Sequence, residues 1–175
     1  MMNSIPLVGA LAPRSAGKAY PSTADMVLEL NTITESTKDM TAQIEQYQGG
    51  LSHLLYLTKG TYKVYDSAMN AQKRVASTPT NQERGEEDRV LAATYEIMNA
   101  LNNALVATSS KTILVKKIPS GSSMVQAVLR KIREAKEGLQ DALLGHCANG
   151  FTQDILDLFC EFDKEYTDLM TELRA

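Results

Sequence analysis

Apolar and small residues recur between positions 26 and 54 at alternating intervals of four and three. This series consists of Met26, Leu30, Ile33, Thr37, Met40, Ile44, Tyr47, Leu51 and Leu54. A seven-residue repeat of this kind is typical of a helix that buries one stripe against partner helices. A second series with the same spacing lies near the end of the chain, at Ile155, Phe159, Phe162, Tyr166, Leu169 and Leu173. The two series predict an all-α protein, an elongated helical bundle with coiled-coil-like heptad helices near both ends.

Gly49 and Gly50 interrupt the first series and leave two interpretations. The chain either turns as a hairpin at the glycines or continues through them as one helix of about 50 residues, since a seven-residue seam can run that far. Each glycine inside a helix costs about 1 kcal/mol relative to alanine, but a tight turn has no reason to preserve the spacing. We therefore expect a continuous helix that bends at the glycines.

The middle of the chain carries two further helical stripes. The first contains Val90, Ile97, Leu101 and Leu105, and the second contains Val125, Val128, Leu129, Ile132, Leu139 and Leu143. Between them, Thr112 to Ile118 is rich in β-branched residues, but no second segment offers a partner strand. We expect an extended or irregular connector there, or the end of a helix.

Residues 1–22 contain three prolines and two basic residues but no acid. Prolines at this spacing prevent a stable helix, so we expect a flexible arm over 1–22 and a single helical-bundle domain over 23–175. The apolar stretch from Ile5 to Ala12 lacks a preceding Lys or Arg, which does not fit a conventional signal peptide. The prediction is a soluble protein without a membrane span, with export by an uncleaved signal or incorporation into a virion left open.

Residues that could catalyse a reaction or bind a metal are scarce. His53 lies alone in the first series, and His146 adjoins Cys147, with Cys160 further along the chain. His146, Cys147 and Cys160 are only three potential ligands, one fewer than a structural zinc site requires. The side chains of His146 and Cys147 are adjacent in a turn and should point apart, which disfavours a Cys–His catalytic pair. We expect two free thiols, with one disulfide as the alternative. The sequence predicts no enzyme activity, no cofactor and no metal.

Charge is distributed unevenly along the chain. A basic strip without any acid contains Lys111, Lys116, Lys117, Arg130, Lys131 and Arg133. The final helix is acidic and includes Asp157, Glu161, Asp168 and Glu172. We hypothesise that the basic strip of one subunit docks on the acidic helix of another. The alternatives are a solvated face with local ion pairs, and a nucleic-acid patch, which the lack of interleaved aromatic residues weakens.

These features favour a non-enzymatic structural or assembly subunit that self-associates through amphipathic helices. Secretion filaments and virion coats contain subunits of this general plan. One alternative is a helical adaptor or chaperone that binds a partner's amphipathic helix. Another is a helical bundle that binds nucleic acid, which the net charge of −3 disfavours. The expected partner is therefore a second copy of the chain or another helical protein.

Overall fold

The computed structural model describes residues 22–79, 84–147 and 151–175. In these ranges the chain forms six helices and no strand, which confirms the all-α prediction. The helices are α1 (Thr23–Glu45), α2 (Leu51–Ser77), α3 (Arg84–Ser109), α4 (Thr112–Lys116), α5 (Gly121–His146) and α6 (Thr152–Glu172). The predicted arm lies outside the described residues, except for Ser22. Ser22 caps α1: its side-chain hydroxyl accepts a hydrogen bond from the backbone N–H of Asp25, and its own backbone N–H donates to the Asp25 carboxylate in return.

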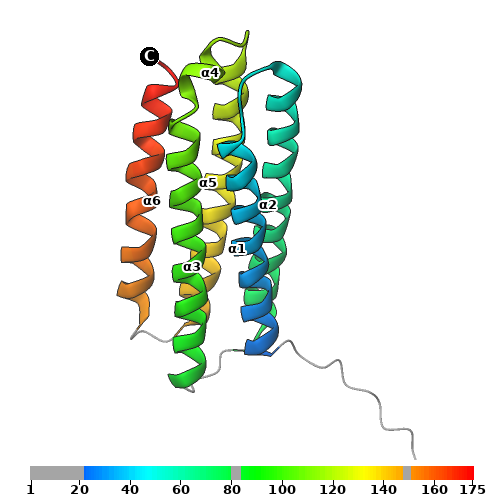
Figure 1. Ribbon diagram of the computed structural model, residues 1–175. Coiled ribbons are helices and arrows are strands. Elements are labelled where there is room, and N and C mark those ends of the chain that lie inside the picture. The colour runs from blue at the N-terminus through cyan, green and yellow to red at the C-terminus, as the bar shows by residue number, and fades with distance from the viewer. Residues whose placement is uncertain (1–21, 80–83, 148–150) are drawn as a thin grey trace, which may run out of the picture.

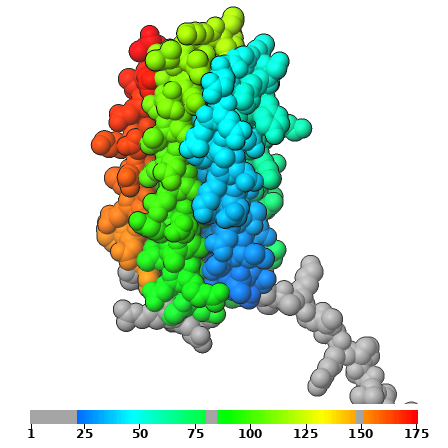
Figure 2. All heavy atoms as spheres, viewed as in Figure 1, coloured from blue at the N-terminus to red at the C-terminus, as the bar shows by residue number. Residues whose placement is uncertain are grey.

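The five long helices run alternately up and down and pack as a closed ring (Figure 1). Each contacts two others, in the order α1, α2, α5, α6, α3 and back to α1. Figure 1 shows the α1–α2 turn, α4 and the C-terminal end of α6 together at one end of the bundle, here called the α4 end. In Figure 2, α3 lies between α1 and α6 on one face of the molecule. The two heptad series are therefore separated by α3, and each contributes to one shared core.

The continuous helix expected through the glycine pair is wrong, and the hairpin alternative is correct. Gly49 and Gly50 have φ angles of +105° and +93°, values that glycine adopts without the steric cost other residues meet. The chain reverses there between α1 and α2. Met40, Tyr47 and Leu54 of the series are buried in the same core, whereas Leu51, at the start of α2, is 50% exposed and does not belong to the buried stripe. The repeat therefore reflects two antiparallel helices of one bundle, and no coiled-coil rod forms.

The β-branched segment at 112–118 forms the short helix α4 followed by a turn. No described segment offers it strand hydrogen bonds, and the local amides bond backward instead. The amides of Leu114 and Val115 both donate to the carbonyl of Lys111, at 2.9 and 3.0 Å. Thr112 and Val115 are buried beneath the neighbouring helices. The segment thus lies across the α4 end of the bundle and does not extend along its axis like the five long helices.

The stripes expected for α3, α5 and α6 are largely buried. In α6 every member of the second heptad series has an exposed fraction of 5% or less. Short amphipathic helices are marginal in water, so this packing stabilises α6. Cys147 is half-buried and Cys160 is exposed, and both are free. Burial, with a smaller contribution from Glu87, raises the pKa of the Cys147 thiol to about 11, which makes it a poor nucleophile.

Candidate functional site

A partly enclosed cavity of about 70 Å³ lies inside the ring near the α4 end. All six helices and the α1–α2 turn contribute to its wall, for example Met40 of α1, Val115 of α4 and Phe162 of α6. Its polar lining residues are Tyr47, Thr58, Thr61 and Thr108. The other lining side chains are apolar, and none is charged. Such a cavity excludes ions and accepts an apolar group.

A smaller cavity of about 20 Å³ lies further from the α4 end. Leu101 and Ile132 line both cavities, so the two share a wall on the bundle axis. Along α5 the lining runs from Val125 in the larger cavity to Leu139 in the smaller one. Fourteen residues of helix at 1.5 Å each make this distance about 21 Å. We call the two together the axial cavities.

The buried cation Lys136 borders the smaller axial cavity. Its side chain is 2% exposed, and its ammonium donates to both carboxylate oxygens of Asp163, at 3.0 and 3.1 Å. The same ammonium lies 5.5 Å from the ring centroids of Phe159 and Phe162. The carboxylate and the aromatic faces together compensate the charge, so Lys136 already has its partners.

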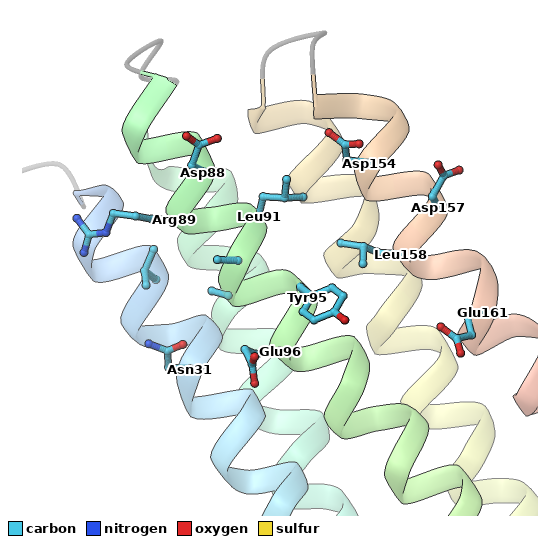
Figure 3. Close-up of a pocket in the computed structure, with 13 residues that line it drawn as sticks. Asn31, Asp88, Arg89, Leu91, Tyr95, Glu96, Asp154, Asp157, Leu158 and Glu161 are labelled. Atoms are coloured by element: carbon cyan, nitrogen blue, oxygen red, sulfur yellow. The ribbon is translucent and has the colours of Figure 1, made fainter.

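An open groove of about 890 Å³ crosses the outer surface between α1, α3 and α6 (Figure 3). Figure 3 shows Leu91 and Tyr95 of α3 facing Leu158 of α6. The groove also carries five acids, Asp88, Glu96, Asp154, Asp157 and Glu161, against one lining cation, Arg89. This wet, acidic surface disfavours a ligand with a carboxylate head. The axial cavities are therefore the better candidate site for an apolar ligand.

The predicted basic strip is divided between two parts of the bundle. Lys111, Lys116 and Lys117 lie in and beside α4, whereas Arg130, Lys131 and Arg133 project from α5. Two of the α5 cations pair within their own helix: Lys131 with Glu134 at 3.5 Å and Arg133 with Glu137 at 2.9 Å. Arg130 and Arg133 also line an open crevice between α5 and α6. Local pairing on a solvated face describes this part of the strip.

The four predicted acids occupy separate surfaces. Asp157 and Glu161 line the acidic groove, and Asp168 is exposed. Glu172 accepts hydrogen bonds from the hydroxyls of Thr112 and Ser109. These bonds, with Lys116 nearby, lower the pKa of Glu172. The hydrogen bonds from Ser109 and Thr112 to Glu172 thus fasten the C-terminal end of α6 to the α3–α4 junction within one chain.

The axial cavities cannot be recognised from the spacing of residues along single helices. The available signal was the set of small residues on otherwise bulky stripes, namely Thr58, Thr61, Ala104 and Thr108. Small side chains opposite each other leave space that large ones fill. Tyr47 appeared only as one member of the first heptad series. Its place in the cavity wall follows from the turn at Gly49 and Gly50, which the heptad spacing did not predict.

Solved structures with the same fold contain bound fatty acids. One is AfMP4p in complex with palmitic acid, which is 16% identical with a TM-score of 0.81 and aligns over 86% of this chain and 99% of that chain. Another is ligand binding domain 1 of the Penicillium marneffei MP1 protein complexed with arachidonic acids, at 12% identity and a TM-score of 0.76, over 83% and 94% of the two chains. Domain 2 of the same protein, also with arachidonic acids, has 14% identity and a TM-score of 0.75, over 83% and 92%. A comparison with curated proteins found no match.

The comparisons with known proteins overturn the functions expected from the sequence. The matched proteins bind hydrophobic surfaces or fatty acids. The expected functions were an assembly subunit of a filament or coat, an adaptor or chaperone, and a nucleic-acid-binding bundle, and these expectations are wrong. The expected partners, a second copy of the chain or a helical protein, are also wrong, because the ligands in the structural neighbours are fatty acids. None of the described helices has the length and apolarity to cross a bilayer. The model of one family, hydrophobic surface binding protein A, matches residues 23–145, and the chain belongs to that family.

Proposed function

We propose that the protein binds one long acyl chain in the axial cavities, as a binding protein without enzymatic activity. The observation that carries the proposal is the uncharged, hydrocarbon-lined space enclosed by all six helices. Burial of methylene groups there gains about 0.8 kcal/mol each. Proteins of the same fold that hold palmitic or arachidonic acid support this choice of ligand.

The length of the axial cavities suits an acyl chain, but their volume requires the helices to move. One acyl chain spans roughly 15 Å, half of a bilayer's hydrocarbon core, and the axial lining extends about 21 Å along α5. The larger cavity of about 70 Å³ is far below the roughly 300–1,000 Å³ of ordinary ligand pockets. We infer that the ligand enlarges a small preformed cavity, as in cryptic pockets.

The entry route that we propose is the contact between α5 and α6. A crevice of about 620 Å³ separates the outer parts of these helices, with Arg130, Tyr166 and Met170 in its wall. Tyr166 stacks on Phe162 with ring centroids 6.0 Å apart, and Phe162 lines the larger cavity. Outward movement of this aromatic pair would connect the crevice with the axial cavities.

We also propose that residues 23–175 form one domain, although the family model ends at residue 145. α6 contacts both α3 and α5 and so completes the ring. Without it, Phe159 and Phe162 would be missing from the wall of the axial cavities. The last helix is therefore part of the proposed binding site.

Ala104→Leu should strongly weaken the binding of palmitic acid, because the larger side chain fills the larger axial cavity. Ala104 is 4% exposed and lines that cavity. Isothermal titration calorimetry of both proteins with palmitic acid measures the effect, and we expect at least a tenfold loss of affinity, about 1.4 kcal/mol. Ala127→Leu is the matched control, since Ala127 is exposed on α5. Unchanged binding by Ala104→Leu would place the ligand elsewhere.

A further inference from the structure

Tyr47 carries a buried hydroxyl that has no hydrogen-bond partner among the described residues. The side chain is 1% exposed and lines the larger axial cavity. The ring of His53 lies edge-on at 5.2 Å and contacts the tyrosine ring. An unpaired buried hydroxyl is costly in a folded protein, so natural cores seldom keep one. This one is placed where a ligand could bond with it.

The remaining hydroxyls of the cavity wall already donate hydrogen bonds to backbone carbonyls. Thr58 donates to the carbonyl of Leu55 at 2.7 Å, and Thr61 donates to that of Leu57 at 3.2 Å. Thr108 donates to the carbonyl of Ala104 at 2.7 Å. Each threonine oxygen retains lone pairs and can still accept a hydrogen bond. The wall therefore offers a ligand one free donor, at Tyr47, and several acceptors.

The wall offers no positive charge for an ionised head group. None of the residues that line the larger cavity is charged, and Lys136 in the smaller one is bonded to Asp163. Burying a carboxylate without a cation or several donors is strongly unfavourable. Burial also raises the pKa of Tyr47, so its hydroxyl remains a donor. This combination suits a head group that both accepts and donates without carrying charge.

We propose that Tyr47 determines head-group specificity, and that the axial cavities take a long-chain lipid whose head is an uncharged oxygen group. Long-chain alcohols and protonated fatty acids belong to this class. The Tyr47 hydroxyl donates to the head oxygen, and the head hydroxyl donates to a threonine oxygen of the wall. The proposal rests on acyl binding in the axial cavities as proposed above.

The competing arrangement places an ionised head group outside the cavity, in the α5–α6 crevice. Arg130, Arg133 and Arg174 lie there together with Glu134 and Glu137. Arg133 is held by Glu137 at 2.9 Å and lies 5.2 Å above the ring of Tyr166. In that arrangement, carboxylates would bind better than alcohols, and Arg133 would determine the preference. The two arrangements therefore differ in ligand preference and in the residue that controls it.

The test is calorimetric titration of the wild type and of Tyr47→Phe with 1-hexadecanol and with palmitate at pH 8. We expect the wild type to bind 1-hexadecanol more tightly than palmitate. Tyr47→Phe should weaken 1-hexadecanol binding about five- to tenfold, the value of one neutral hydrogen bond. Tyr56→Phe is the matched control, because Tyr56 is 58% exposed on α2 and its affinities should equal those of the wild type.

The ligand-free protein provides a second measurement. Loss of an unpaired buried hydroxyl should raise the melting temperature of Tyr47→Phe by about 3–6 °C, whereas Tyr56→Phe should leave it unchanged. Equal affinity of Tyr47→Phe and wild type for 1-hexadecanol would overturn the inference. So would a palmitate preference that Arg133→Gln removes. If Ala104→Leu blocks both ligands and Tyr47→Phe blocks neither, the head-group inference alone fails; if the wild type binds neither, the proposed function fails.

Discussion

Phe162→Ala should lower the free energy of unfolding by about 3–5 kcal/mol, the cost typical of removing a buried phenylalanine. Phe162 has no exposed surface, lines the larger axial cavity and stacks on Tyr166. Alanine would merge the vacated space with the cavity, so the surrounding helices would lose dispersion contacts that they cannot recover. Urea denaturation followed by circular dichroism measures this loss.

Leu156→Ala is the matched control for that substitution. Leu156 lies on the same helix but is 38% exposed, and its replacement should change stability by roughly 0.5 kcal/mol or less. A loss below about 1 kcal/mol for Phe162→Ala would contradict the packing of α6 into the shared core.

Asp163→Ala should destabilise the protein by about 3 kcal/mol, because it leaves the Lys136 ammonium buried without its carboxylate. The effect is at the low end of the range for buried pairs, since the side chain of Asp163 is 46% exposed. The two aromatic faces near Lys136 compensate only part of the charge. Thermal and urea unfolding of the variant measure the change.

Lys136→Met separates the charge from the packing of the side chain. Methionine keeps an unbranched apolar stem near Phe159 and Phe162, and Asp163 remains partly solvated. Replacement of a buried ion-pair member by an apolar residue of similar shape should then cost less than about 1 kcal/mol. In the double variant Lys136→Met/Asp163→Ala, the second substitution should cause little further loss of stability, since its penalty depends on the buried charge of Lys136. A Lys136→Met loss as large as that of Asp163→Ala would contradict this account.

The helices and their buried stripes could be predicted from the sequence, because burial on one side of a helix imposes a regular spacing. The second heptad series is buried in α6 as expected, from Ile155 to Leu173. The turn at Gly49 and Gly50 could not be predicted from that spacing. Both flanking helices face one core, so their stripes happen to remain in phase across a reversal of direction. The two adjacent glycines were the stronger signal in the sequence, because glycine adopts the positive φ angles found at this turn without steric cost.

The binding site depends on which helices become neighbours, and spacing within one helix does not contain that information. Ala104 and Thr58 lie on different helices and leave space only because the ring brings them to one cavity. Tyr47 joins them through the α1–α2 turn. The segregated charge has a local explanation in part: Lys131 and Arg133 form ion pairs with glutamates about one turn away in their own helix.

An exposed apolar stripe on α2 offers a competing location for an acyl ligand. Leu51, Leu55 and Tyr62 are each 50–52% exposed, and their spacing of four and seven places them on one face of the helix. An acyl ligand bound to this stripe would be adsorbed on the outside of the bundle. A ligand bound in the axial cavities would be enclosed by all six helices.

Methyl NMR spectroscopy of the protein with bound palmitic acid distinguishes these locations most directly. The account predicts nuclear Overhauser effects between the acyl chain and the methyl groups of Ala104, Leu105 and Val128, which line the larger axial cavity. Effects confined to Leu51 and Leu55 on α2, or to Leu91 and Leu158 in the acidic groove, would contradict enclosure of the ligand.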